Sequence, residues 1–214
     1  TGLAYSPDGW TISTTGAADE HSPVRIWDAI SGELQADWPQ PSDVYSLAFS
    51  PDGKQLAVAG AGGPVRMGNY GSGASIGSWQ VLPSSDRFVL FAPDGELLIT
   101  GQRGPGFQIW DVKTAKLLVA VPDKHVFARV FSADGRFLLT AGDHWDGTVR
   151  VWELPAGRRI ATLIGPASTI HGLDISPDGQ TVAAGSNAGT IQLYDATEWQ
   201  PKSTLMLPPD PKWP

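Results

Sequence analysis

A four-residue turn signal recurs five times along the chain at nearly constant spacing. Successive copies begin 44, 42, 40 and 44 residues apart, and they read Ser6-Pro-Asp-Gly9, Ser50-Pro-Asp-Gly53, Ala92-Pro-Asp-Gly95, Ser132-Ala-Asp-Gly135 and Ser176-Pro-Asp-Gly179. Proline presets φ at the first turn position, aspartate can hydrogen-bond its own backbone, and glycine accepts a positive φ. A period of about 40 residues indicates a repeat protein in which each repeat is one supersecondary unit.

Each repeat contains four short segments with the character of β-strands, and residues 131–153 are the clearest copy. A strand such as 44–49 precedes the turn. The run after the turn, such as 56–59, is apolar without alternation, which predicts that both of its faces are covered. A third strand such as 149–152 alternates. A fourth, such as 158–163, begins with a charge that suits an outer edge. Helical periodicity is absent, so the sequence predicts about twenty strands.

The turns, together with aromatic-acidic pairs that close the third strands, resemble the WD-repeat β-propeller family. Four such pairs occur, namely Trp27-Asp28, Trp110-Asp111, Trp152-Glu153 and Tyr194-Asp195. The resemblance covers essentially the whole chain. It implies an all-β propeller of five four-stranded antiparallel blades over 1–207, at about 1–39, 40–83, 84–123, 124–165 and 166–207. It leaves open a closed five-bladed ring or an open part of a larger propeller. The Pro-rich tail, 208–214, is expected to pack across a blade or to act as a linker.

The chain departs from the family pattern in two places. In the second repeat Gly68 and Asn69 occupy the closing-pair positions, which weakens the prediction of a third strand there. The family's glycine-histidine signal is absent, and Gln40 and Gly165-Pro166 stand in its place in two repeats. The resemblance therefore implies that the family's buried His/Asp/Ser/Trp network cannot form, although Asp146 and Trp152 match two of its members. Apolar packing is expected to hold the blades together.

Composition excludes several classes of function. The net charge of −7 opposes the phosphate neutralisation on which nucleic-acid binding rests. The absence of cysteine excludes disulfides, thiolate metal sites and cysteine nucleophiles. No apolar run approaches the length of a membrane helix. The chain opens at Thr1 without methionine, as a processed or excised chain would, which leaves room for further blades or domains upstream.

Two loops hold side chains of the types that ligate metals, Asp19-Glu-His21 and Asp143-His-Trp-Asp146. Asp146-Gly147 also fits a hairpin turn, and acidic residues of exposed loops are ordinarily solvated, so the structural interpretation is favoured over a metal site. None of the four histidines lies in a nucleophile motif, and glycines follow the repeat instead of forming a phosphate-binding loop. The sequence therefore predicts no catalytic residues, cofactor or metal.

Partner binding is expected where the first strand of each repeat begins, because in the WD-repeat family interaction residues often lie five positions before the turn serine. These positions hold Thr1, Tyr45, Arg87, Phe127 and His171. Neighbouring loops add Arg103, His144 and Trp145. Aromatic and arginine side chains are enriched in binding hot spots. For Tyr45 and Phe127, packing between blades is an equally good interpretation.

We therefore expect a non-catalytic propeller that mediates protein–protein interaction, either as a subunit of an assembly or as the sensing and scaffolding part of a larger protein. The partner is another protein, and nucleic acid is not expected. A small-ligand or metal-binding site in the central funnel, with or without enzymatic activity, is the alternative. A purely structural spacer is the third interpretation.

Overall fold

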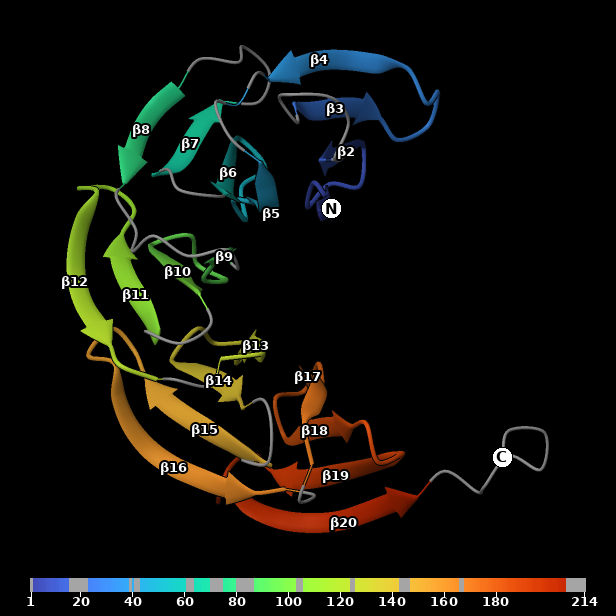
Figure 1. Cartoon of the computed structure of the whole chain (residues 1–214), viewed down its shortest axis with the longest axis vertical. Coiled ribbons are helices and arrows are strands. Elements are labelled where there is room, and N and C mark those ends of the chain that lie inside the picture. The colour runs from blue at the N-terminus through green and yellow to red at the C-terminus, as the bar shows by residue number, and fades with distance from the viewer. Residues whose placement is uncertain are drawn as a thin grey trace. The chain divides into compact units, whose positions relative to one another are not determined.

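The structure is a computed structural model that describes residues 2–15, 23–38, 40, 43–60, 64–69, 75–79, 87–102, 106–123, 126–142, 147–165 and 168–206. These residues form strands and turns (Figure 1), and no helix that could span a membrane occurs among them. The strands make five four-stranded antiparallel sheets, which we call blades 1 to 5 in chain order. The predicted number of blades and of strands is confirmed. Arg103, His144, Trp145 and the tail 208–214 lie outside the described residues.

The chain divides into two compact units, one holding blades 1 to 3 and the other holding blades 4 and 5. The strands of the first unit are β1 (Gly2–Tyr5), β2 (Thr11–Thr15), β3 (Val24–Asp28), β4 (Leu34–Trp38), β5 (Val44–Phe49), β6 (Gln55–Gly60), β7 (Val65–Asn69), β8 (Ser75–Trp79), β9 (Arg87–Phe91), β10 (Leu97–Gln102), β11 (Gly106–Asp111) and β12 (Lys116–Val121). Those of the second unit are β13 (Ala128–Phe131), β14 (Phe137–Ala141), β15 (Thr148–Glu153), β16 (Arg158–Ile164), β17 (Ile170–Ile175), β18 (Thr181–Ser186), β19 (Thr190–Asp195) and β20 (Gln200–Met206).

The second strand of a blade is the centre of its core. In β6 five consecutive residues are buried, and β14 shows four. Because successive side chains of a strand point to opposite faces, such a run needs cover on both sides, as the sequence predicted. Within the second unit, Leu139 of β14 and Ala184 of β18 belong to one buried cluster that also contains Tyr194. The packing of one blade on the next therefore buries the apolar runs.

The turn between the first and second strands repeats the same backbone hydrogen bond in each blade. In blade 2 the Gly53 N–H donates to the Ser50 carbonyl over 2.9 Å, and Gly53 has φ 71°. The Ser50 hydroxyl donates to Asp52 Oδ1 over 2.6 Å and accepts from the Gln55 N–H over 3.0 Å. Blade 3 has Ala92 in place of this serine. The turn aspartates therefore have a structural role, because their carboxylates accept hydrogen bonds that stabilise the hairpin turn.

Blade 2 has a complete third strand despite its unusual sequence. β7 pairs with β6 through Gln55 and Asn69, and through Leu56 and Gly68, in the regular antiparallel register. The weakened prediction of a strand here is therefore corrected. Pairing depends on the backbone groups and on the buried Val65 and Met67, and glycine supplies the backbone groups as well as tryptophan does.

The turn hydroxyl provides a paired stability test. Ser50→Ala removes a donor to Asp52 and the acceptor of a strand N–H, so we expect the free energy of unfolding to fall by about 1 kcal/mol. Ala92→Ser installs the missing hydroxyl in blade 3 and should raise it by up to about 1 kcal/mol. Urea unfolding of both variants measures the two changes. Effects of the same sign would show that the hydroxyl does not act through this turn.

The turn aspartates also predict a dependence of stability on acid. The Ser50 hydroxyl, and then the Lys54 N–H, hold the pKa of Asp52 below its usual value of 3.8 in the folded chain. A pKa lowered by folding contributes stability that is fully present above the unfolded pKa and is lost as pH falls through the folded pKa. The urea midpoint should therefore be level between about pH 7 and 5 and decline below about pH 4. Asp52→Asn keeps the acceptor oxygen without titrating, and its decline should be shallower; an equal decline would contradict the assignment.

Candidate functional site

Two predicted binding residues sit at irregularities of the first strand. In β5 the pairing with β6 passes from Val44 to Ser46, so Tyr45 is the extra residue of a β-bulge. In β17 the pairing with β18 passes from Ile170 to Gly172, and His171 is extra in the same way. A bulge bends the strand and re-aims the side chain that it carries. Tyr45 is 38% exposed and His171 is exposed, which makes both side chains accessible.

The structure brings two of the predicted residues together. The rings of Phe127 and His171 meet edge to face, with centroids 4.9 Å apart and planes at 89°. Phe127 precedes β13 and His171 lies in β17, so the contact joins the starts of the first strands of blades 4 and 5. Phe127 is half-buried beneath the exposed imidazole. The ring of Phe127 therefore packs between blades 4 and 5 against an accessible side chain, and its role in partner binding stays a prediction.

A third residue, Arg129 of β13, belongs to the same site. Its Nη1 donates to the carbonyl of Phe127 over 3.4 Å, and its side chain is half-buried. Burial lowers the pKa of the guanidinium to about 10, so it stays charged at neutral pH. The three residues Phe127, Arg129 and His171 are called the first-strand cluster.

Sequence reasoning missed Arg129, although a signal was present. The position three residues before the turn signal holds an aliphatic residue in the other four repeats, namely Leu3, Leu47, Val89 and Leu173. The structure pairs Arg129 with Thr140, just as it pairs Leu47 with Val58. An arginine at an aliphatic position of a repeat is a local exception, and such exceptions are expected at functional sites.

The remaining predicted residues divide between described and undescribed parts of the chain. Arg87 begins β9, and its backbone pairs with Gln102 without a bulge. Thr1, Arg103, His144 and Trp145 lie outside the described residues, as do both loops with metal-ligating side chains. Within the described ranges no group of three or more His, Asp or Glu side chains could hold a metal ion.

Blade 4 contains a buried polar network, and its member Thr140 pairs with Arg129 in the strand register. The Thr140 hydroxyl donates to Asp123 Oδ2 over 2.9 Å and accepts from Trp152 Nε1 over 2.8 Å. Arg150 Nη1 lies 3.4 Å from Asp123 Oδ1, and the side chains of Arg150 and Asp123 are only 11% and 4% exposed. This buried polar network is present in addition to the apolar packing that the sequence predicts between blades. Asp123 accepts the hydrogen bond of the Thr140 hydroxyl directly, and no histidine takes part in the described contacts of this network.

Other blades keep part of this arrangement. Trp27 Nε1 donates to Thr14 Oγ1 over 2.8 Å in blade 1, and Trp110 Nε1 donates to Thr100 Oγ1 over 2.9 Å in blade 3. In blade 5 the hydroxyl of Tyr194 donates instead to the carbonyl of Ile164 over 3.2 Å, and burial raises the pKa of Tyr194 to about 12. The aromatic residue of each closing pair thus acts as a hydrogen-bond donor that ties the third strand to its surroundings.

The network gives a graded prediction. Thr140→Val leaves both the Asp123 carboxylate and the Trp152 indole N–H without their threonine partner, so we expect a loss of about 2 to 4 kcal/mol in the free energy of unfolding. Thr100→Val breaks the indole bond in blade 3, where the described contacts include no carboxylate, and should cost about 1 to 2 kcal/mol. Denaturant unfolding compares them. A larger loss for Thr100→Val would contradict the role given to Asp123.

Comparison with known proteins identifies the repeats. The family described as WD domain, G-beta repeat, matches residues 32–63, 118–153 and 157–195, together half of the chain. Several curated proteins are similar to the chain over most of its length. They include a periodic tryptophan protein 2 homolog from Dictyostelium discoideum, which is 29% identical over 92% of this chain and 22% of that protein. A guanine nucleotide-binding protein subunit beta from Oryza sativa subsp. japonica is 26% identical over 90% of this chain and 54% of that protein. Telomerase protein component 1 from Rattus norvegicus is 27% identical over 91% of this chain and 7% of that protein. The chain thus spans about half or less of the length of these relatives.

Proposed function

Because the chain belongs to the WD-repeat family of β-propellers, we propose that it is a non-catalytic scaffold whose first-strand cluster docks another protein. It serves as a subunit of an assembly or as the scaffolding part of a larger polypeptide. The observation that carries this proposal is the β-bulge that presents His171 beside Phe127, and Tyr45 stands at the equivalent bulge of blade 2. Because a β-bulge re-aims the side chain of its extra residue, the same bulge in two blades directs the two side chains in the same way relative to their strands.

The chemistry of the cluster suits protein recognition. Aromatic rings and a guanidinium offer large contact areas with few rotatable bonds, and these residue types are enriched among the side chains that dominate binding energy. Arg129 is held by the Phe127 carbonyl, and Phe127 is held by the ring of His171. The cluster is therefore arranged before a partner arrives, which lowers the entropy cost of binding.

The relatives support the same role in a general way. Two of their names denote parts of larger assemblies, a subunit beta and a protein component. Rigid folds of this kind carry unrelated functions in their loops, so the names support protein binding and leave the partner open. The net charge of −7 favours a protein over a nucleic acid as partner.

Site-specific photo-crosslinking tests the proposal. A diazirine amino acid is placed at position 45 or 171 of the full chain in its source cells, and at position 205 of the outer strand β20 as a control. Leu205 is 52% exposed, so it is at least as accessible as Tyr45, and it lies in the fourth strand of blade 5 and not in a first strand. We expect a defined polypeptide to be captured at 45 or 171, and Phe127→Ala to reduce the yield at 171 about tenfold. Equal capture of the same polypeptide at 205, or no capture at 45 and 171, would overturn the proposal.

A further inference from the structure

A pocket of about 280 Å³ lies between blades 4 and 5, at the opposite end of β13 and β17 from the first-strand cluster. It is lined by residues of three turns, of the start of β14 and of the end of β17, namely Ser132, Ala133, Asp134, Phe137, Ile175, Asp178, Gly179, Ala196, Thr197 and Trp199. Pockets for drug-sized ligands are usually about 300 to 1,000 Å³. This pocket lies just below that range and has room for one large side chain.

Two aromatic residues form one wall of the pocket. The rings of Phe137 and Trp199 meet at 80° with centroids 5.4 Å apart. Trp199 has a positive φ of 55° at a turn position that holds Gly32, Ala115 and Gly157 in other blades, with φ of 72°, 54° and 62°. A bulky residue is disfavoured in this conformation, and it persists only where its surroundings compensate. The aromatic wall is thus particular to this pair of blades.

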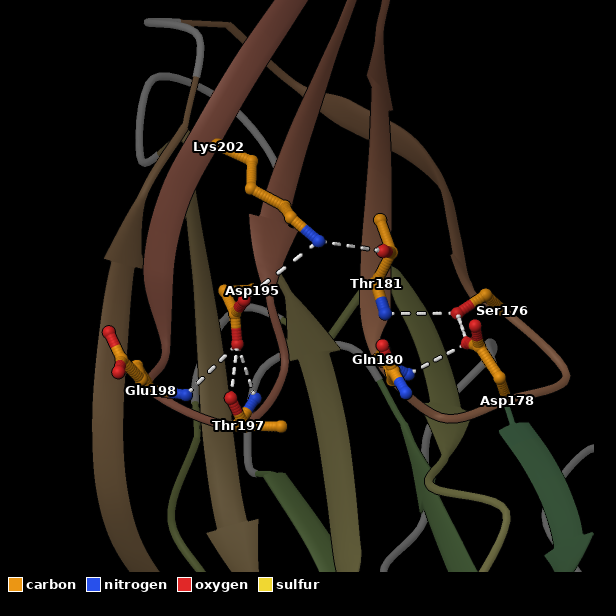
Figure 2. Close-up of polar contacts among 8 residues, drawn as sticks. All are labelled: Ser176, Asp178, Gln180, Thr181, Asp195, Thr197, Glu198 and Lys202. Atoms are coloured by element: carbon orange, nitrogen blue, oxygen red, sulfur yellow. Dashed lines mark hydrogen bonds and ion pairs between the residues drawn. The ribbon is translucent and has the colours of Figure 1, made fainter.

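Carboxylates form the rim. Asp178 Oδ1 accepts from the Ser176 hydroxyl and the Gln180 N–H (Figure 2), which holds the pKa of Asp178 below its usual range. Asp134 is held the same way by Ser132 and then by Arg136. Both carboxylates are exposed and ionised at neutral pH, and only one oxygen of each is used by these turn hydrogen bonds. The second oxygens are available to face a ligand.

The charges beside the pocket are unbalanced. Asp134 and Asp178 line the pocket, Arg136 acts on Asp134, and Lys202 acts on Asp178 and Asp195, so three negative charges stand against two positive ones. Lys202 Nζ lies between Asp195 Oδ2, at 3.8 Å, and Thr181 Oγ1, at 3.3 Å (Figure 2). The guanidinium of Arg136 lies 5.4 Å from the centre of the Phe137 ring. The wall therefore already accepts one guanidinium of this chain.

We propose that this pocket binds one arginine side chain of a partner protein. The guanidinium is planar and weakly hydrated, stacks on aromatic faces and pairs with carboxylates through two hydrogen bonds, so it matches both the wall and the rim. Its methylene stem lies against the apolar side chains of Ala133, Ile175 and Ala196. This site is separate from the first-strand cluster, because it lies at the opposite end of β13 and β17. It would add a contact that requires a positively charged side chain on the partner.

The test uses the full ¹⁵N-labelled chain and acetyl-Gly-Arg-Gly-amide as the probe. The indole N–H signal of Trp199 is identified with Trp199→Ala, which the turn accommodates because Ala115 occupies the same position of blade 3. We expect a saturable shift of this signal. The same peptide with citrulline, which keeps the shape of arginine without its charge, should bind at least about fivefold more weakly.

Matched variants assign the binding to the pocket. Asp134→Asn with Asp178→Asn keeps the acceptor oxygens of both turns and removes the two charges, and it should weaken binding about tenfold. Asp8→Asn with Asp52→Asn makes the same change in blades 1 and 2, where Thr11 and Gln55 stand at the position of Phe137, and should leave binding unchanged. Equal binding of the citrulline peptide, an equal loss in the control variant, or no saturable shift would overturn the proposal. His171→Ala should not affect this titration, so its outcome is independent of the first-strand docking.

Discussion

The structure depends on covering the second strands of blades 2 to 4 on both faces. The run 56–60 is buried throughout, and a four-stranded sheet alone covers neither face. One blade must therefore stack on the next, and the shared core of blades 4 and 5, with Leu139 and Ala184 in one cluster, is the result. Because the core uses the middle of the strands, the turns and strand starts at both ends of the blades are free to carry other side chains. The proposed first-strand cluster and the proposed arginine pocket occupy these two ends.

A repeat protein supplies its own comparison at each position. Arg129 stands where four other repeats have Leu or Val, and Trp199 stands where three have Gly or Ala. Each exception carries a cost, because Arg129 is partly desolvated and Trp199 has a positive φ. Both exceptions occur in the second unit. At both positions the other repeats have residues that are less destabilising. The presence of Arg129 and Trp199 there therefore indicates that these two ends of the blades have a function besides closing a hairpin.

The buried network of blade 4 shows how a repeat can lack the family's histidine and still provide hydrogen-bond partners for buried polar groups. Thr140 needs an acceptor for its hydroxyl while it receives the indole N–H of Trp152, and a buried carboxylate meets that need as an imidazole would. The carboxylate of Asp123 needs a counter-charge, and Arg150 on the third strand provides it at 3.4 Å. The polar position of that strand, which alternation marks in the sequence, is therefore part of the fold.

The sequence by itself determined the repeat, the turns and the strands of each blade other than the third strand of blade 2, because these depend on contacts between residues close in the chain. It also placed Phe127 and His171 at equivalent positions, and their rings do meet. It did not reveal the bulges at Tyr45 and His171, the partnership of Asp123 with Thr140, or the pocket walled by Phe137 and Trp199. Each of these depends on which backbone or side chain another strand or blade brings near, and chain periodicity carries no information on that. Only the tertiary structure decided them.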